Sequence, residues 1–405
     1  MVTLAMVFGA LTPLVVGALG PYIVPALSLS KKELGLFVTS SFAVATLASP
    51  ASGRLVDRVD GRVVVSALFG IGAVTLLGLA ATPSLAVLLA LALPAGVVQA
   101  ACNPVTNRLI ALYVTTRLRG IVVGTKQAGV HIGGFAAGLV LPVIALAAGW
   151  RAAVTVAAAA ALAALWLARR VVPPGDAAAR GDVHAGAMPA PAAVEPPGAP
   201  DRPAPSRGRD RLVAYLTVYA FFMGGGVAAI STYMPLYAHE RIGLDETTAG
   251  SVLAAFSFTG VAARLAWGWA GDRVVGVHRV LGLLAAASTV AGLLLWHAEA
   301  GPAWTVWVAA VGLGLSAAAW NAVGMLAVVR EVPRAHVGRA TGLVNVGFFG
   351  GFILSPIVFG AVVDATGDYR AGWLAIAAYF LLATALSVWS AARAPAGGDV
   401  ARPAV

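Results

Sequence analysis

The feature that most constrains this chain is a series of apolar runs, each of about 20 residues, separated by short charged gaps. A helix that rises 1.5 Å per residue crosses a bilayer core of about 30 Å in such a run. Inside hydrocarbon, backbone polar groups must be paired within a helix or a closed barrel, and these runs are too long for barrel strands. The chain is 60% hydrophobic and 11% charged. The sequence therefore predicts an all-α, polytopic membrane protein.

We expect twelve transmembrane helices, arranged as two pseudo-symmetric bundles of six. The first run begins almost at Met1, lacks a positively charged leading segment and extends to about Leu27, so we interpret it as an uncleaved span. The expected spans begin near Thr3, Glu33, Arg62, Ser84, Gly120, Arg151, Leu212, Asp245, Val280, Pro302, Val337 and Ala371.

A segment rich in Pro, Ala and Gly separates the bundles, over residues 169–211. It has almost no large apolar side chains, so it cannot bury enough surface to offset its ordering entropy. We expect a flexible cytoplasmic linker there, between an N-terminal bundle (1–168) and a C-terminal bundle (212–392), with a cytoplasmic tail at 393–405.

Positive charge gathers in every second gap between spans. The basic gaps hold Arg54, Arg58 and Arg62; Arg108, Arg117 and Arg119; Arg169, Arg170, Arg207, Arg209 and Arg211; Arg273 and Arg279; and Arg330, Arg334 and Arg339. Because cytoplasmic loops of membrane proteins are enriched in Lys and Arg, both termini and the linker should face the cytoplasm. The net charge of +10 then reflects topology in a cell membrane rather than nucleic-acid binding.

The two halves share a spaced set of residues that indicates an internal duplication. An offset of 218 residues pairs Asn103 with Asn321, Gly124 with Gly342, Gly129 with Gly347 and Gly133 with Gly351. A similar offset of 215 pairs Gly53 with Gly268 and Asp57 with Asp272. Several matches at one offset across equivalent spans favour two six-helix repeats.

The loop after the second span carries a recognisable motif, GRLVDRVDGR, over residues 53–62. It resembles the G-x-L-x-D-R-x-G-R signature of the major facilitator superfamily, except that Asp60 is inserted before the second glycine. A degenerate copy, GWAGDR, follows the eighth span at 268–273. The resemblance implies an alternating-access transporter whose cytoplasmic side these loops lock. The implied gating residues are Gly53, Asp57, Arg58, Gly268, Asp272 and Arg273.

Ionisable residues within spans are costly, so they are candidates for function. Lys126 and His131 lie in the fifth span and Arg264 in the eighth. Lys126 lies about 10 Å inside the cytoplasmic start of its span and Arg264 about 12 Å from its own cytoplasmic end, which places the two cations at similar depth. No acidic residue lies in the middle of a span, so an anionic substrate is the expected partner. Alternatively, Lys126 is neutral or solvated in a wet cavity.

His131 should lie near mid-membrane, where its ordinary pKa near 6.5 suits a proton carrier; a neutral histidine bonded to a neighbouring helix is the alternative. Gln127 lies one turn before it on the same face. Further candidates for lining the substrate site, chosen from pattern alone, are Tyr22, Tyr219, Tyr233, Trp320 and Asn321, and Asn345 is added as a polar residue within the eleventh span. Packing or interface anchoring is the alternative role for the aromatic residues.

The spacing of Arg264 to Asp272 is similar to that in monocarboxylate and oxalate transporters, where this arginine binds carboxylate. The segment from Gly124 to Gly129 resembles permeases for cyanate-like anions. We therefore expect a permease for a small, carboxylate-type anion, with protons as the candidate coupling ion. A proton-driven exporter is the alternative, although the spans lack its membrane carboxylate.

An enzyme or a receptor is a third possibility, but no His, Cys, Asp and Glu cluster at ligand spacing and no phosphate-binding loop is present in the sequence. We expect no cofactor, no metal and a monomer. The single cysteine, Cys102, excludes an intrachain disulfide.

Overall fold

The computed structural model describes residues 1–174, 206–270, 277–332 and 337–392, and all regular structure in these ranges is helical. The N-terminal half contains α1 (Val2–Ala18), α2 (Gly20–Ala26), α3 (Lys31–Arg58), α4 (Gly61–Ala81), α5 (Leu85–Tyr113), α6 (Thr116–Ala148) and α7 (Trp150–Val171). The C-terminal half contains α9 (Ser206–Glu240), α10 (Glu246–Ala270), α11 (Val277–Ala298), α12 (Trp304–Ser316), α13 (Trp320–Glu331), α14 (Val337–Thr366) and α15 (Tyr369–Ala392).

The helices confirm the all-α membrane class. By length and hydropathy, ten helices of the described chain can cross a membrane, or eleven if the bent pair α1–α2 forms one span. The expected first span is bent rather than continuous, because α1 and α2 meet at an angle of 65°. Pro21 in the first turn of α2 explains the break, because proline lacks an N–H and restricts the residue before it.

Two helices begin earlier than the sequence suggested. α6 begins at Thr116 instead of near Gly120, and α9 begins at Ser206 instead of near Leu212. Both extensions are basic, with Arg117 and Arg119 in the first and Arg207, Arg209 and Arg211 in the second. Hydropathy identifies only the part of a helix inside the bilayer, whereas the backbone hydrogen bonds of the helix continue outside the bilayer.

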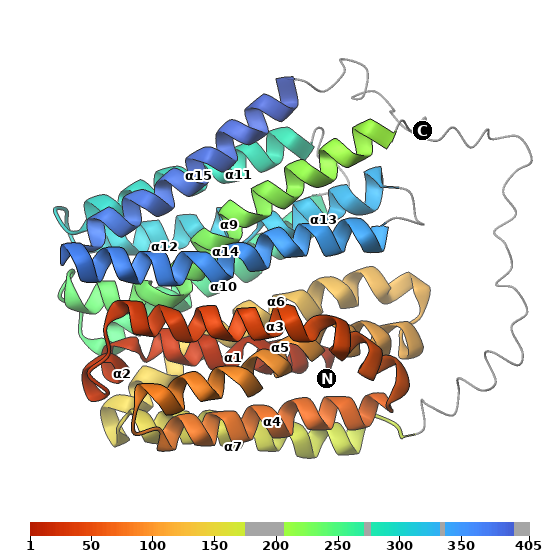
Figure 1. The fold of residues 1–405 in the computed structure, drawn as a ribbon, viewed down its shortest axis with the longest axis horizontal. Helices are drawn as coiled ribbons and strands as arrows, with labels where there is room; N and C mark the ends of the chain where they lie inside the picture. The colour runs from red at the N-terminus through yellow and green to blue at the C-terminus, as the bar shows by residue number, and fades with distance from the viewer. Residues whose placement is uncertain (175–205, 271–276, 333–336, 393–405) are drawn as a thin grey trace, which may run out of the picture.

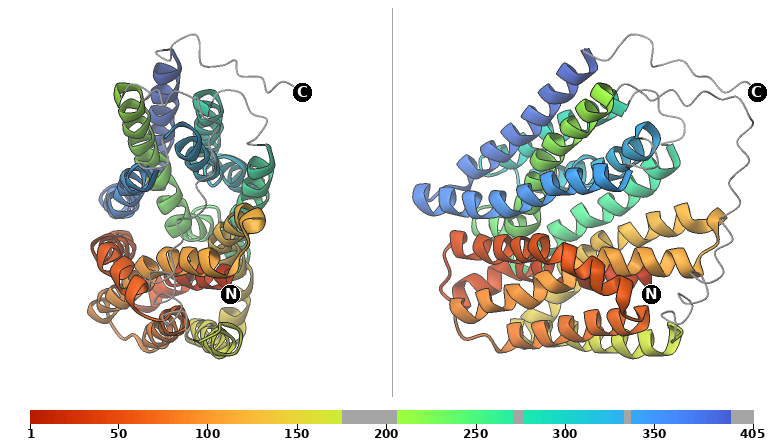
Figure 2. Two further views of the ribbon diagram at one scale, coloured as in Figure 1. Left: turned by 90° about the vertical axis from the view of Figure 1, so that its right-hand side faces the viewer. Right: turned by 45° about the vertical axis from the view of Figure 1, so that its right-hand side comes forward.

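The two halves are separate helix bundles that face each other (Figure 1). We call the end where α7 ends and α9 begins the linker end, and the opposite end, where α3 and α10 begin, the distal end. The halves meet toward the distal end, and their ribbons diverge toward the linker end (Figure 2).

The repeated glycines have equivalent neighbours in the two halves. A Cβ at Gly129 of α6 would lie 2.5 Å from the carbonyl oxygen of Thr3 in α1, and a Cβ at Gly347 of α14 would lie 2.0 Å from that of Thr217 in α9. The next pair along these helices, Gly133 and Gly351, also faces α1 and α9 respectively. The same glycine spacing therefore produces the same close helix contact twice, as expected for duplicated bundles.

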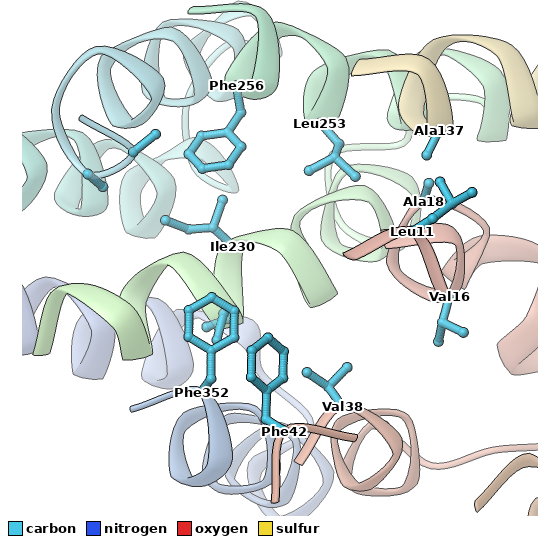
Figure 3. Close-up of a cluster of buried hydrophobic side chains, with 14 of the residues drawn as sticks. Leu11, Val16, Ala18, Val38, Phe42, Ala137, Ile230, Leu253, Phe256 and Phe352 are labelled. Atoms are coloured by element: carbon cyan, nitrogen blue, oxygen red, sulfur yellow. The ribbon is translucent and has the colours of Figure 1, made fainter. Parts of the chain in front are cut away.

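Apolar side chains from both halves form the contact between the bundles (Figure 3). Phe42 of α3 lies beside Phe352 of α14, with ring centroids 4.2 Å apart. On the other side of this contact, Leu253 and Phe256 of α10 lie toward Ile230 and Ala137 (Figure 3). The two halves are thus held by packed side chains as well as by the connecting chain.

Some sequence expectations lie outside the described residues. These are the linker between 175 and 205, the tail at 393–405, Asp272 and Arg273, and the side-chain surroundings of Asp57 and Gly268.

Candidate substrate site between the two halves

Two helices that begin at opposite ends of the molecule, α6 and α10, cross with their backbones in close contact. A Cβ at Gly138 of α6 would lie 2.6 Å from the carbonyl oxygen of Gly250 in α10. A Cβ at Gly250 would in turn lie 2.4 Å from Cγ of Pro142. Small residues on both helices therefore permit this approach. The crossing brings the polar residues further along α6 and α10 into one region.

Lys126 of α6 is buried, with 1% of its surface exposed. Its ammonium donates to the side-chain oxygens of Asn103 (3.1 Å) and Asn107 (2.6 Å), both on α5. These asparagines are four residues apart, so they lie on one face of the helix. An ammonium has three donors and no acceptor, so neutral oxygens solvate it here without cancelling its charge.

Arg264 of α10 links the two halves through backbone oxygens. Its Nε donates to the carbonyl of Ala318 (2.9 Å), and Nη1 donates to the carbonyl of Gln127 (3.0 Å), which belongs to α6. Because Gln127 follows Lys126 in the chain, the two cations lie at similar depth, as the spacing along the spans predicted. Among the described residues, neither cation has a carboxylate within ion-pair distance.

The acceptor at Ala318 exists because the tenth span is broken. α12 ends at Ser316 and α13 begins at Trp320. The amide of Ala322, which would bond to Ala318 in a continuous helix, donates instead to Ala319 (3.1 Å). The break frees the carbonyl of Ala318, and Arg264 satisfies it. Broken spans with freed backbone groups are a recurring component of transporter sites.

His131 lies on α6 between the crossing and Lys126. Its ring is 5% exposed and meets Phe256 of α10 edge-on, with ring centroids 5.8 Å apart. A Cβ at Gly260 would lie 3.1 Å from His131 Nδ1, so a larger residue there would press against the ring. Within the described structure, neither ring nitrogen forms a hydrogen bond with another residue. A role for His131 in carrying protons stays a prediction.

The other site candidates lie in several places. Tyr22 belongs to α2 at the distal end, where its hydroxyl donates to the carbonyl of Pro142 (3.2 Å). Pro142 is about 24 Å from Lys126 along α6, so the structure does not bring Tyr22 to the cations. Trp320 is 1% exposed and packs between Tyr219 and Phe348. Asn321 on α13 and Asn345 on α14 are both partly exposed.

A second crossing, between α3 and α14, repeats the first. Gly35 of α3 corresponds to Gly250 at the 215-residue offset, and a Cβ there would lie 2.4 Å from the carbonyl oxygen of Pro356. Gly360 meets the backbone of Lys31 equally closely. At the 218-residue offset, Pro356 and Gly360 occupy the positions of Gly138 and Pro142. The two crossings are therefore pseudo-symmetric.

The side chains along the second crossing are aromatic rather than polar. At the same offsets, Phe349 replaces His131, Phe352 replaces Gly134, and Phe42 replaces Ser257. The ring centroids of Phe42 and Phe349 are 6.0 Å apart. We call α6 with α10 the polar crossing, defined by Lys126, His131, Ser257 and Arg264, and α3 with α14 the aromatic crossing, defined by Phe42, Phe349 and Phe352.

The signature loop lies at the linker end, and its inserted residue, Asp60, caps the helix that follows. Asp60 is the N-cap of α4, and its carboxylate accepts from the amide of Arg62 (2.8 Å). Arg108 of α5 donates to the carbonyls of Val56 and Val59 (2.6 Å for the second) at the end of α3. Gly53 has open space at its Cβ position, so close packing does not explain this glycine in the present conformation.

At the distal end, polar contacts join the halves around the start of α3. The ammonium of Lys31 pairs with Glu240 of α9 (2.8 Å). Both oxygens of Asp364, at the end of α14, accept the amides of Lys31 (2.9 Å) and Lys32 (2.8 Å). The hydroxyl of Tyr233 also bonds to the carbonyls of Lys31 (2.8 Å) and Pro356 (2.6 Å). This end of the interface is therefore closed by direct bonds between halves.

Sequence reasoning missed Asn107 and treated Asn103 only as a repeat match. An available signal was the Asn-x-x-x-Asn spacing on an otherwise apolar helix, because amide side chains in a span need partners. The positive-charge pattern places Arg108 in a basic gap, but it does not predict the bonds of this arginine to the end of α3. The distal bonds of Asp364 join residues more than 330 positions apart, and no local pattern marks them.

Comparison with known proteins agrees with this architecture. A 34% identical stretch of 189 residues matches the probable nitrate/nitrite transporter NarK2 of Mycobacterium tuberculosis, covering 46% of each chain. The nitrite extrusion protein of Bacillus subtilis is 28% identical over 185 residues, covering 45% of each chain. Monocarboxylate transporter 13 of Rattus norvegicus is 31% identical over 153 residues, covering 37% of this chain and 35% of its own. The matches thus span less than half the length of these relatives.

Solved structures show the same fold over nearly the whole chain. A point mutant of the nucleoside transporter NupG superposes with a TM-score of 0.75 at 16% identity, covering 96% of this chain and 98% of its own. A bacterial homolog of the human lysosomal transporter Spinster, in an inward-facing and occupied conformation, gives 0.72 at 16% identity, covering 100% and 97%. The family model of the Major Facilitator Superfamily matches residues 1–247 and 216–404. This chain is therefore a transporter of the Major Facilitator Superfamily.

Proposed function

We propose that this transporter moves a small oxyanion across the cytoplasmic membrane by alternating access. One observation carries the proposal: each half contributes one cation, Lys126 or Arg264, to the polar crossing, and both are held by neutral oxygens. Buried charges without counter-charges are strongly unfavourable. An anionic substrate supplies the missing charge.

The chemistry of the donors narrows the substrate class. Arg264 uses two of its five N–H donors on backbone carbonyls, which leaves further donors of the planar fork for a ligand. Such a fork suits a planar group with delocalised negative charge, which nitrate, nitrite and a carboxylate share. The names of the relatives, nitrate/nitrite and monocarboxylate transporters, include anions of this kind.

The conformation supports alternating access with the linker end open to the cytoplasm. Among the described residues, Arg58, Arg62, Arg169 and Arg170 lie at the linker end, which orients this end toward the cytoplasm under the positive-inside rule. The distal bonds of Lys31, Lys32 and Tyr233 then close the external side. We therefore assign the structure to an inward-facing state in which the anion site communicates with the cytoplasm.

A binding titration of the purified protein tests the proposal. Nitrate, nitrite, acetate and oxalate serve as ligands, with a small organic cation for comparison. Lys126→Ala and Arg264→Ala should each weaken anion binding, on the order of 2–5 kcal/mol if the pair is fully buried. Ser49→Ala is the matched control, because Ser49 on α3 occupies the position of Arg264 at the 215-residue offset. Transport of the cation with unchanged binding in both alanine variants would reject the anion proposal.

Proton coupling through His131 is a separate part of the proposal. The ring lies on α6, one turn beyond the carbonyl that receives Arg264. A titrating imidazole here would make uptake depend on pH, whereas His131→Gln would keep the polar volume without titration. Equal pH profiles for the wild type and His131→Gln in proteoliposomes would exclude His131 as the proton carrier.

A further inference from the structure

The cluster of Lys126, Asn103 and Asn107 has a directional arrangement of donors and acceptors. The ammonium of Lys126 has no acceptor, so both asparagines must present Oδ1 to it. This fixes the orientation of both amides, and each Nδ2 group points away from the lysine. Each Nδ2 carries two N–H donors and no acceptor.

The outward side of this cluster is accessible. Lys126 is 1% exposed, whereas Asn103 and Asn107 are both exposed. A Cβ at Gly124, two residues before Lys126, would meet open space. Within the described ranges, no residue accepts a hydrogen bond from Nδ2 of Asn103 or Asn107. The accessible side therefore presents amide donors backed by one positive charge.

We propose that Asn103 and Asn107 are specificity-determining residues that select oxyanions lacking a hydrogen-bond donor. The inference rests on the proposed function and assigns a substrate class to the same site. A group that only accepts hydrogen bonds, such as nitrate, can satisfy every amide donor that it meets. An anion of similar shape with an O–H, such as bicarbonate, brings one donor against a donor and leaves both unpaired.

The pseudo-symmetric half shows that the fold does not require this cluster. At the 218-residue offset, Lys126 corresponds to Val344 and Asn107 corresponds to Met325, while Asn103 corresponds to Asn321. The equivalent helix pair thus forms without an ammonium and with a single asparagine. The cluster is a local addition to the N-terminal half, as a one-sided ligand site requires.

The experiment compares nitrate and bicarbonate binding to the full-length purified protein at mildly alkaline pH. The variants are Asn107→Asp, Asn103→Asp and the conservative Asn107→Gln. An aspartate still accepts from Lys126 but offers no donor and cancels the charge. The wild type should prefer nitrate by about tenfold, the size expected for one unpaired donor contact. Each Asp variant should weaken nitrate more than bicarbonate, so that the ratio falls toward one, and Asn107→Gln should keep the preference.

A merely structural role makes a different prediction. If the asparagines only position Lys126, all variants should change both affinities by the same factor and leave the ratio unchanged, which would overturn the inference. Arg264→Ala, measured in parallel, separates the two proposals. If Arg264→Ala no longer binds either anion, and the ratio of nitrate to bicarbonate affinity is unchanged in the Asp variants, only the selectivity role is rejected. Absence of anion binding by the wild type rejects both. If an Asp variant fails to fold, Asn107→Ala replaces it, because alanine also removes the amide donor but adds no carboxylate. The ratio of nitrate to bicarbonate affinity is then measured in this variant.

Discussion

The polar crossing of α6 with α10 and the aromatic crossing of α3 with α14 differ in chemistry but share a backbone arrangement. Each brings two helices from different halves together at a glycine, Gly250 in one and Gly35 in the other. Beyond that contact, the polar crossing continues into His131 and Arg264, whereas the aromatic crossing continues into Phe42 and Phe349. Backbone contact between halves is therefore separable from the side chains that each crossing carries.

This difference shows how two duplicated halves can carry a polar site at only one of their two crossings. Close glycine contacts set the geometry, and they recur at matching offsets. The side chains that face between the halves are then free to diverge, because either a packed aromatic cluster or a hydrogen-bonded polar cluster satisfies the same backbone. If so, variants in the aromatic crossing should change stability and variants in the polar crossing should change ligand binding.

The largest expected effect is on stability, at the aromatic crossing. Phe352 is 9% exposed, and its ring packs at a tilt against Phe42 and Phe348, with centroids 4.2 Å and 4.7 Å apart. Phe352→Ala should lower the free energy of unfolding by about 3–5 kcal/mol, because it removes packed ring contacts and leaves a cavity. Thermal unfolding in detergent measures this change, and anion affinity should stay within about twofold.

The matched control for this variant is Phe258→Ala on α10, whose side chain is 61% exposed. Its truncation should change unfolding little, because it leaves no buried cavity. A Phe352→Ala protein with normal unfolding but weakened anion binding would contradict the division between the two crossings.

The next effect concerns binding at the polar crossing. Arg264→Lys keeps the charge but removes the planar fork, so a lysine cannot hold Ala318, Gln127 and an oxyanion together. Anion affinity should fall by about 1.5–3 kcal/mol, the size of a hydrogen bond to a charged group. Isothermal titration measures it, and the unfolding temperature should change much less than in Phe352→Ala. An unchanged affinity would mean that charge alone, and not the fork, serves the anion.

A smaller effect should be common to both crossings, because it depends on backbone contact. A Cβ at Gly250 would meet Pro142 Cγ at 2.4 Å, and one at Gly35 would meet the Pro356 carbonyl oxygen at the same distance. Gly250→Ala and Gly35→Ala should each disfavour the closed distal end by about 1–3 kcal/mol through overpacking. Alkylation of a cysteine at Thr39, in a Cys102→Ala background, reports opening of this end.

Gly342→Ala on α14 is the control, because its Cβ position meets nothing within 4 Å. It should leave alkylation unchanged and favour the helix slightly. A strong response to Gly250→Ala but none to Gly35→Ala would show that the two crossings are unequal in closing the distal end.

The sequence predicted the two-bundle fold and the shared depth of Lys126 and Arg264, because both follow from regular helices of known rise. It did not predict the partner of Arg264 at Ala318. That carbonyl is free only because the helix breaks within Ala317–Ala319, and alanine is the best helix former, so no local signal marks the break. The sequence also placed Tyr22 in the site, because no pattern marked the 65° bend between α1 and α2. The bend moves this residue onto a separate helix at the distal end.

The smallest expected effect concerns the distal bond of the aromatic crossing. Asp364 receives two amides in the first turn of α3, although it belongs to the other half, so it stabilises the helix N-terminus only while the halves are closed there. Asp364→Asn keeps one acceptor oxygen but loses the second and the charge. It should shift the equilibrium toward the externally open state by about 0.5–1 kcal/mol, a few-fold increase in alkylation at Thr39→Cys.

The control is Asp245→Asn, because Asp245 accepts hydrogen bonds from the amides of Thr247 (3.1 Å) and Thr248 (3.0 Å) at the start of α10 within its own half. Its bond from the Thr248 hydroxyl (2.5 Å) holds the pKa of the Asp245 carboxyl below its ordinary value, so this cap is ionised at neutral pH and is lost only in acid. Asp245→Asn should therefore leave the equilibrium unchanged at neutral pH. Equal shifts in the two variants would show that the capping charge acts on helix stability in general, and not on contact between the halves.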